Sequence, residues 1–355
     1  MKNNDRNELL GRCLNSGLPF SLYREPGKKR VYVLIETSQK GNNNKQGFVF
    51  VPFDRQHKPL FINADILAYE GEALPEIINA EKGGLPYKAG NCNVYIATED
   101  EYCEQVRQAV NVMKNKEIQK IVLSHIRKYP RPEDFNIFHF FDKICDALPE
   151  AFCYVFFHPE AGLWCGASPE LLMRYDGALV ETVALAGTRN AENKTAEDAH
   201  WKEKERVEQQ YVSDYISECL QTEGVEDIHV TGPVTARAGN LFHLKTFFKG
   251  KAGQNFSAER LAAALHPTPA VCGLPTQLAR HFMLSTEKHD RAYYSGYAGP
   301  VNIDIPALFH VNLRCMQVFD DALALYVGAG ITEDSDPQSE WIETCRKSET
   351  LLKIL

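Results

Sequence analysis

Apolar and polar positions in the first hundred residues predict short strands joined by polar turns. Residues 30–35 and 47–52 are runs of β-branched and aromatic side chains, a composition typical of strands. Between them, the segment around residues 41–44 is rich in asparagine, lysine and glycine, which is typical of a turn. No residue pattern in this part of the chain indicates chemistry.

From residue 101 onwards, helical and strand patterns follow one another in blocks. Apolar residues at helical spacing predict helices at 101–116, at 137–144, at about 195–220, on either side of 266–269 and at 337–355. β-Branched and aromatic runs predict strands at 120–126, repeatedly within 152–186, and at 227–231, 241–248, 293–301, 307–319 and 322–327. Consecutive antiparallel strands separated by whole helices predict an α+β fold.

Nothing in the sequence divides the chain. No stretch rich in proline, glycine and serine is long enough to be a linker, so we expect one domain over residues 1–355. Within it, residues 1–100 are strand-rich and residues 101–355 carry every motif described below.

Composition and charge exclude several classes of protein. The 355 residues are 44% hydrophobic and carry a net charge of −8, which argues against a binder of nucleic acid or anionic membranes. The ten cysteines form no C-x-x-C pair, and no apolar run approaches the ~20 residues that a membrane span needs. The first residues lack the apolar stretch of a signal peptide, so we expect a cytoplasmic protein.

Two glutamates occupy positions that need an explanation. Glu208 lies on or inside a helical stripe that includes Val207, Tyr211 and Val212, where a charged carboxylate must be paired with a cation or bind a metal. Glu343 precedes Lys347 by four residues, the spacing of an ordinary surface ion pair. Two carboxylates from separate helices are also what Mg²⁺ needs beside an anionic ligand. Both interpretations remain open at this point.

Near the end of the chain, Gly328-Ala329-Gly330 is expected to leave a strand and to expose successive backbone N–H groups, which can bind an anion. A simple tight turn is the alternative. Asp336-Pro337 follows, with the signature of a helix cap. Arg314 is expected in the middle of a strand between apolar neighbours, where a carboxylate is its best partner.

A lysine and a glutamate begin two of the predicted strands. Lys120 starts a strand that is otherwise almost wholly apolar, so it is either a solvated residue at the strand end or a base with a depressed pKa. Glu170 follows a turn at 166–169 and could be a proton donor with a raised pKa if it faces a cleft. Its alternative is an ordinary glutamate at a strand end.

Nine short motifs occur in order over about 120–347, and together they resemble the chorismate-utilising enzyme family, most closely its isochorismate synthases. They are 120–124 (KIVLS), 166–172 (GASPELL), 185–189 (LAGTR), 204–208 (KERVE), 266–270 (HPTPA), 273–275 (GLP), 291–296 (RAYYSG), 328–331 (GAGI) and 343–344 (ET). The resemblance implies a single α+β domain of two packed antiparallel sheets, with helices outside and a deep cleft that holds chorismate and Mg²⁺.

The resemblance also implies a role for each candidate residue in the isomerisation of chorismate to isochorismate. Lys120 would activate the water that adds to C2, and Glu170 would protonate the departing C4 hydroxyl. Glu208 and Glu343 would hold Mg²⁺, with Glu205 and Glu340 acting on it through water. The residues expected to contact the substrate are Thr188, His243, Tyr294, Arg314, Gly328, Ala329, Gly330 and Lys347.

Other activities of the same family remain as alternatives. A salicylate synthase would share these residues and would go on to eliminate pyruvate. Lys120 argues against the large subunit of anthranilate synthase, and Ala186 argues against aminodeoxychorismate synthase. The resemblance implies that both of those enzymes have glutamine in place of Lys120, and that the second has lysine in place of Ala186. A non-catalytic chorismate-binding protein would have no reason to keep these costly charges. We expect a monomer with chorismate as its partner and no obligatory glutaminase subunit; the pathway, quinone or siderophore synthesis, is left open.

Overall fold

The computed structural model describes residues 3–37, 45–54, 56–69, 87–190, 195, 200–238 and 241–355. The helices are α1 Asn3–Asn15, α2 Glu99–Met113, α3 Ile137–Ala147, α4 Glu203–Thr222, α5 Ala258–Leu265, α6 Thr276–Thr286 and α7 Pro337–Leu352. The first strands are β1 Phe20–Arg24, β2 Val31–Ile35, β3 Gly47–Val51, β4 Leu60–Asn63, β5 Ile66–Tyr69, β6 Lys120–Pro130, β7 Phe152–His158, β8 Gly162–Ser168 and β9 Leu171–Tyr175. They are followed by β10 Leu179–Asn190, β11 Val225–Ala238, β12 Leu241–Ala252, β13 Gly273–Leu274, β14 Tyr297–Val301, β15 Ala307–Val311, β16 Cys315–Val318 and β17 Ala322–Ile331.

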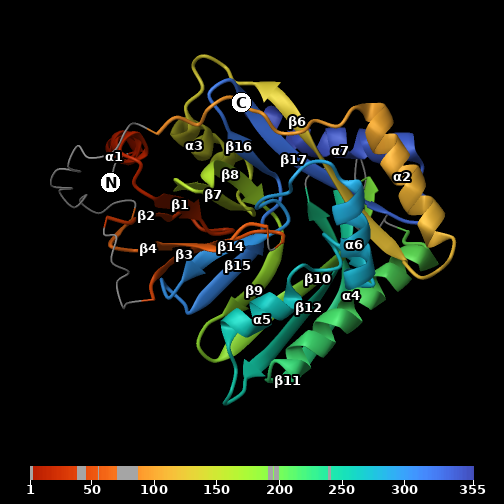
Figure 1. Cartoon of the computed structure of the whole chain (residues 1–355). Coiled ribbons are helices and arrows are strands. Elements are labelled where there is room, and N and C mark those ends of the chain that lie inside the picture. Colours follow the sequence, from red (N-terminus) through yellow and green to blue (C-terminus); the bar gives the residue numbers. More distant parts are fainter. Residues whose placement is uncertain are drawn as a thin grey trace.

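These strands form two antiparallel sheets, which confirms the predicted α+β class. The nine-stranded sheet has the order β13-β6-β17-β16-β8-β7-β1-β2-β5, and the eight-stranded sheet has the order β11-β12-β10-β9-β15-β14-β3-β4. Figure 1 shows the first sheet in the upper part of the view and the second below it. The strands of the first seventy residues extend both sheets, β1, β2 and β5 in one and β3 and β4 in the other.

The chain crosses between the sheets at two short connections that matter for the site. One lies between β8 and β9, around Glu170, and the other lies between β15 and β16, around Arg314. The prediction of a single strand over 307–319 was therefore wrong. Residues 312–314 leave one sheet and enter the other, and hydrophobic patterning cannot distinguish that crossing from a continuous strand, because both ends are buried.

Helices cover the outer faces of the sheets. Helix α4 lies along β10 and β12, α7 packs on β17 with α2 beside it, and α3 packs on β7 and β8 (Figure 1). Helix α7 begins as the sequence predicts, with the Asp336 side chain accepting a hydrogen bond from the Ser339 backbone N–H at 2.9 Å. The expected buried face of α4 was partly wrong: Val212 is buried, but Val207 and Tyr211 are exposed.

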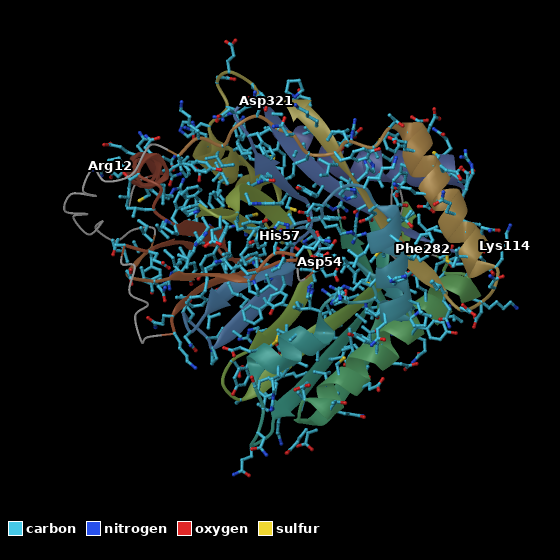
Figure 2. All side chains as sticks on the ribbon, viewed as in Figure 1. Arg12, Asp54, His57, Lys114, Phe282 and Asp321 are labelled. Atoms are coloured by element: carbon cyan, nitrogen blue, oxygen red, sulfur yellow. The ribbon has the colours of Figure 1, made fainter. Side chains whose placement is uncertain are left out.

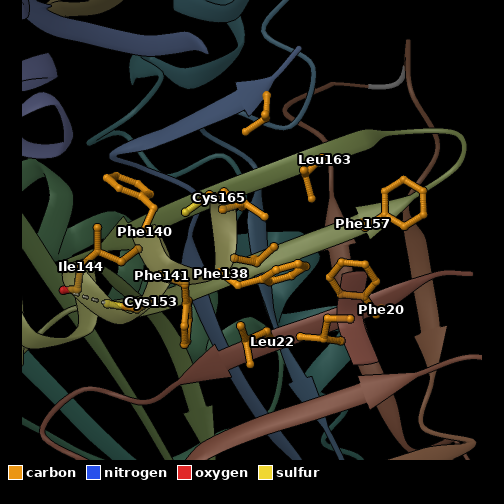
Figure 3. Close-up of a cluster of buried hydrophobic side chains, with 14 of the residues drawn as sticks. Phe20, Leu22, Phe138, Phe140, Phe141, Ile144, Cys153, Phe157, Leu163 and Cys165 are labelled. Atoms are coloured by element: carbon orange, nitrogen blue, oxygen red, sulfur yellow. Dashed lines mark hydrogen bonds between the residues drawn. The ribbon is translucent and has the colours of Figure 1, made fainter. Parts of the chain in front are cut away.

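Aromatic side chains fill the space between the sheets. Phe50 of β3 stacks on Phe156 of β7 with ring centroids 4.3 Å apart, which joins the two sheets directly. A second cluster lies between the nine-stranded sheet and helices α1 and α3, and Figure 3 shows its members Phe20, Phe141 and Phe157. Charged side chains such as Arg12, Lys114 and Asp321 lie at the periphery of the molecule (Figure 2).

The ten cysteines are all free thiols, and most of them are buried. None of the helices in the described part of the chain is both long enough and apolar enough to cross a membrane.

The helix α3 cluster gives a direct test of the fold. Phe141 is fully buried between α3 and the sheet, so Phe141→Ala should lower the free energy of unfolding by about 3–5 kcal/mol through lost burial and the cavity left behind. Urea denaturation measures this loss. Leu278→Ala on α6 is the control, since Leu278 is 47% exposed and its loss should cost less than about 0.5 kcal/mol. Equal effects of the two substitutions would contradict this packing.

Candidate functional site

The centre of the candidate site is the end of the β6–β17 pair, where Lys120 begins β6. Lys120 is only 6% exposed, and its Nζ lies 2.6 Å from Oε1 of Glu208. Glu208 belongs to α4, the helix that packs on the other sheet. The structure therefore brings together a lysine and a glutamate that are 88 residues apart in the sequence. The pairing also explains how a carboxylate is accommodated on the partly buried side of α4.

Two glycines of β17 make room for the side chains above them. A Cβ on Gly330 would lie 3.1 Å from Cε of Lys120, and a Cβ on Gly328 would lie 2.9 Å from the hydroxyl of Tyr294. Residues two apart in a strand face the same side of the sheet, so Lys120 and Tyr294 lie over the same face of β17. Any larger residue at either position would displace one of these polar groups.

The segment Gly328-Ala329-Gly330 lies inside β17. The prediction that it leaves the strand was wrong. It pairs with β6 through Gly328↔Ser124 and Gly330↔Val122. The Val122 N–H donates to Cys272 on the far side of β6, so Val122 and Gly330 are a non-hydrogen-bonded pair and the Gly330 N–H points away from β6. By the same alternation, Gly328 faces the open edge and Ala329 faces β6. The expected row of three amides is therefore reduced to two, those of Gly328 and Gly330.

Cationic side chains gather at this open edge. Lys347 Nζ donates to the Gly328 carbonyl at 2.8 Å and pairs with Glu343 Oε1 at 2.7 Å. Arg314 donates to the backbone carbonyl of Lys347 at 3.2 Å and to Thr350 Oγ1 at 3.3 Å. Helix α7 thus holds a lysine, a carboxylate and, through its backbone, an arginine beside β17.

Arg314 does not lie in the middle of a strand, as its apolar neighbours had suggested. It lies in the bend between β15 and β16 with a φ of 49°, at the crossing between the two sheets. Burial lowers the pKa of Arg314, and the ionisable groups of Tyr294 and Glu343 oppose this shift, which places all three groups within electrostatic reach. Burial also raises the pKa of Tyr294 to about 12, so its hydroxyl is a hydrogen-bond donor at neutral pH.

Glu170 stands where the sequence predicted, directly before β9, and is buried. Burial raises its pKa to about 7, and the positive charge of Lys120 acts in the opposite direction. Lys120 and Glu170 therefore interact electrostatically, so the two groups belong to one site. A carboxyl group with this pKa is partly protonated at neutral pH and can donate a proton.

The remaining predicted residues lie less clearly in the site. Glu205 accepts a hydrogen bond from the Lys202 backbone N–H at 2.8 Å, as part of the α4 cap, and Glu340 accepts one from Ser335 Oγ at 2.7 Å. Both carboxylates thus have structural partners close to their own helix starts. The side chains of Thr188 and His243 lie outside the described residues.

One buried network was missed by the sequence analysis. Glu287 receives the Ser124 N–H at 2.7 Å and the Arg291 Nε at 2.6 Å, and Arg291 also donates to the Val122 carbonyl at 2.6 Å. The network holds β6 at the residues that pair with Gly328 and Gly330. The sequence feature that could have revealed this network is the four-residue spacing of Glu287 and Arg291, beside the motif at 291–296.

The donor set available for a metal consists of carboxylate oxygens. Glu208 and Glu343 belong to separate helices, and each forms an ion pair with a lysine. Within the described part of the chain, no group of three or more histidine, cysteine, aspartate or glutamate side chains could hold a metal ion. Carboxylate oxygens from two helices fit Mg²⁺, which keeps waters and accepts oxygens from a substrate.

Comparisons with known proteins identify the family of this chain. A family model described as chorismate binding enzyme matches residues 79–355. Isochorismate synthase EntC of Escherichia coli K12 is 30% identical over 258 residues, which make up 71% of this chain and 66% of that protein. Isochorismate synthase DhbC of Bacillus subtilis is 35% identical over 198 residues, 54% of this chain and 50% of that protein. The aligned region thus spans between half and just under two thirds of these relatives' length.

A solved structure shares the fold over almost the whole chain. The menaquinone-specific isochorismate synthase MenF of Escherichia coli aligns with a TM-score of 0.79, covers 96% of this chain and 90% of its own, and is 18% identical. At that identity the similarity establishes the fold.

The raised pKa of Glu170 has a consequence for stability. The folded-state pKa of about 7 exceeds the ordinary value of 4.5, so the folded chain binds more protons than the unfolded chain between these values, and stability falls as pH rises through 7. Between about pH 5 and pH 8, wild type should lose about 2–3 kcal/mol relative to Glu170→Gln. Chemical denaturation across this pH range measures the difference, with Glu259→Gln on the exposed side of α5 as the control. Parallel pH curves for wild type and Glu170→Gln would contradict the buried, protonated state.

Proposed function

Since the chain belongs to the family of chorismate binding enzymes, we propose that it isomerises chorismate to isochorismate. The observation that supports this most is the buried pair of Lys120 and Glu170, whose charges interact across one site. The reaction needs a base and an acid at different positions of one ring, and these two residues supply them.

In the proposed reaction, Lys120 acts as the base in its neutral form. It takes a proton from a water whose oxygen bonds to C2 of the ring, while the double bond shifts and the C4–O bond breaks. Glu170, protonated, gives its proton to the departing C4 hydroxyl, which leaves as water. General acid and general base assistance are each typically worth ~10²–10⁴-fold in rate.

The metal would be held by Glu208 of α4 and Glu343 of α7. Mg²⁺ bound there would supply positive charge to the ring carboxylate of the substrate. Glu208 could not then remain the full counter-ion of Lys120, because the same carboxylate oxygens would be shared.

The open edge of β17 would hold the enolpyruvyl carboxylate. Arg314, Lys347 and the N–H groups of Gly328 and Gly330 converge there, and the Tyr294 hydroxyl lies over the same strand. A protein with a net charge of −8 needs such a local concentration of positive groups and donors to bind a dianion.

The choice of water as the nucleophile also determines whether the enzyme needs a partner subunit. A lysine base that activates water needs no supply of ammonia, so the proposed enzyme works without a glutaminase subunit. Isochorismate as the end product is part of the same proposal.

The two proposed proton-transfer residues can be tested together. Lys120→Ala and Glu170→Gln should each lower kcat with chorismate and Mg²⁺ by ~10²–10⁴-fold. Lys128→Ala is the matched control, because Lys128 lies on the same strand, is exposed and pairs with Asp321, so its loss should leave kcat unchanged. Chromatography of the products gives both the rate and the identity of the product.

Three outcomes would contradict the proposal. Unchanged turnover in Lys120→Ala or Glu170→Gln would remove that residue from the reaction. Salicylate plus pyruvate as end products would show a salicylate synthase, and anthranilate formed with ammonia would show a different nucleophile.

Metal removal gives a separate test. Excess chelator should abolish turnover, and added Mg²⁺ should restore it, because two protein carboxylates would bind the ion loosely enough for it to exchange. Glu208→Gln and Glu343→Gln should raise the Mg²⁺ concentration needed for half-maximal activity by roughly tenfold or more, and Glu104→Gln on the exposed side of α2 should not. Full activity in chelator would exclude the metal.

A further inference from the structure

The residue that follows each proposed metal glutamate is polar and buried. Gln209 follows Glu208 on α4, and Thr344 follows Glu343 on α7, and both Gln209 and Thr344 are almost completely inaccessible. Neighbouring residues of an α-helix point about 100° apart, so a helix that turns one residue to a sheet directs the preceding residue along the surface of that sheet. The hydrogen bonds of Gln209 and Thr344 therefore influence where the two carboxylates point.

On α7, the partner of Thr344 is a histidine of the nine-stranded sheet. His125 of β6 is fully buried, and its Nε2 lies 2.8 Å from Thr344 Oγ1. The Thr344 hydroxyl donates its own proton to the Trp341 carbonyl at 2.7 Å, so His125 Nε2 carries a proton and donates to Thr344. Burial lowers the pKa of His125 to about 3, so the imidazole is neutral and has only this one N–H. We call this hydrogen bond the α7 contact.

Aromatic rings hold the imidazole of the α7 contact in place. The His125 ring stacks on the Trp341 ring with centroids 4.5 Å apart and an interplanar angle of 21°. The Tyr102 ring of α2 meets the imidazole edge to face, with centroids 4.9 Å apart. His125 also lies opposite Val327 in the ladder of β6 and β17. Helix α7 is thus tied to this strand pair one residue away from Glu343.

On α4, Gln209 makes the equivalent contact with the eight-stranded sheet. Its Nε2 donates to the Ala184 carbonyl of β10 at 3.1 Å and to Thr246 Oγ1 of β12 at 2.9 Å. Thr246 is buried as well, so these bonds are shielded from water. One side chain thus joins α4 to two neighbouring strands directly beside Glu208. We call these two hydrogen bonds the α4 contact.

Buried hydrogen bonds of this kind set the rotation of a helix in a way that apolar packing does not. Burial of apolar surface has no direction, whereas a hydrogen bond needs a separation of about 2.9 Å and a nearly linear geometry. Rotation of α4 or α7 about its axis would leave the buried donor of Gln209 or His125 unsatisfied, which is costly. The two helices pack on different sheets, so each needs a contact of its own (Figure 1).

We propose that the α4 contact and the α7 contact set the relative position of Glu208 and Glu343, so that the two carboxylates can bind one divalent cation. The inference rests on the proposed function, which assigns these glutamates to the metal. His125, Thr344 and Gln209 are positioning residues, because they act on the ion only through the glutamates. A purely structural role would cost stability and leave the metal affinity unchanged, and the experiment measures this difference.

The test measures metal binding directly, with Mn²⁺ as the probe and the full-length protein. Electron paramagnetic resonance reports free Mn²⁺, which gives a dissociation constant without any turnover. His125→Phe keeps an aromatic ring but has no donor, Thr344→Val keeps the shape without the hydroxyl, and Gln209→Met keeps the length without the amide. Each should raise the Mn²⁺ dissociation constant about tenfold or more, the usual effect of losing a group that orients a metal ligand.

Two matched controls remove buried hydroxyl groups elsewhere. Thr182→Val removes a hydroxyl that donates to the Leu172 carbonyl within the eight-stranded sheet, and Ser213→Ala removes one that donates to the Gln209 carbonyl within α4. Both should leave the Mn²⁺ dissociation constant unchanged, even where they lower stability. Glu343→Gln identifies the Mn²⁺ that binds at this site, because it removes a proposed ligand.

A double variant separates the α7 contact from general damage to the fold. Once one partner of a hydrogen bond is lost, loss of the other should add little, so His125→Phe/Thr344→Val should bind Mn²⁺ as weakly as the weaker single variant. Effects that multiply would show that the two residues act independently and would overturn the α7 contact. Circular dichroism and urea denaturation show whether each variant is folded. If His125→Phe does not fold, Thr344→Val tests the same hydrogen bond through the loss of one hydroxyl.

The outcomes distinguish this inference from the proposed function. Unchanged Mn²⁺ affinity in folded Thr344→Val would overturn the role of the α7 contact, and the same result in Gln209→Met would overturn that of the α4 contact. Equal Mn²⁺ binding by wild type and Glu343→Gln would remove the metal assignment, and the positioning role with it. Mn²⁺ binding that responds as expected, in a protein that does not convert chorismate, would contradict the proposed function alone.

Discussion

The pairing of β6 with β17 through two glycines is the constraint on which the candidate site depends. Because Gly328 and Gly330 lack side chains, Tyr294 and Lys120 can lie over the same face of the strand. The ladder also sends the glycine N–H groups to the open edge, where Lys347 and Arg314 approach. One short stretch of strand therefore fixes the relative position of Lys120, the hydrogen-bond donors and the cations.

Charge compensation is the second theme of the structure. The lysines of the site are paired with Glu208 and Glu343, and Arg291 is paired with Glu287. Burial makes each pair sensitive to loss of one partner, since the remaining charge would be stranded in a poorly solvated position. In the proposed reaction, a substrate carboxylate or a metal ion that binds here would change the partners of these charges.

The sequence predicted the positions of some site residues correctly. Other positions could not be predicted, for physical reasons. Lys120 and Glu170 lie where predicted because each begins a strand, and strand starts are marked by an abrupt change from polar to apolar residues. Arg314 could not be placed, since a chain crossing between two sheets has the same apolar neighbours as a continuous strand. The direction of the Gly328 and Gly330 amides depends on which residue of β6 lies opposite, and register is a tertiary property.

The most direct measurement of the central claim follows the oxygen atom. If the protein adds water to C2 of chorismate and releases the C4 hydroxyl, incubation with chorismate and Mg²⁺ in oxygen-18 water should give isochorismate with one heavy oxygen at C2. Mass spectrometry and NMR of the purified product locate the label. Isochorismate that carries no heavy oxygen at C2, or chorismate that is not converted at all, would contradict the claim.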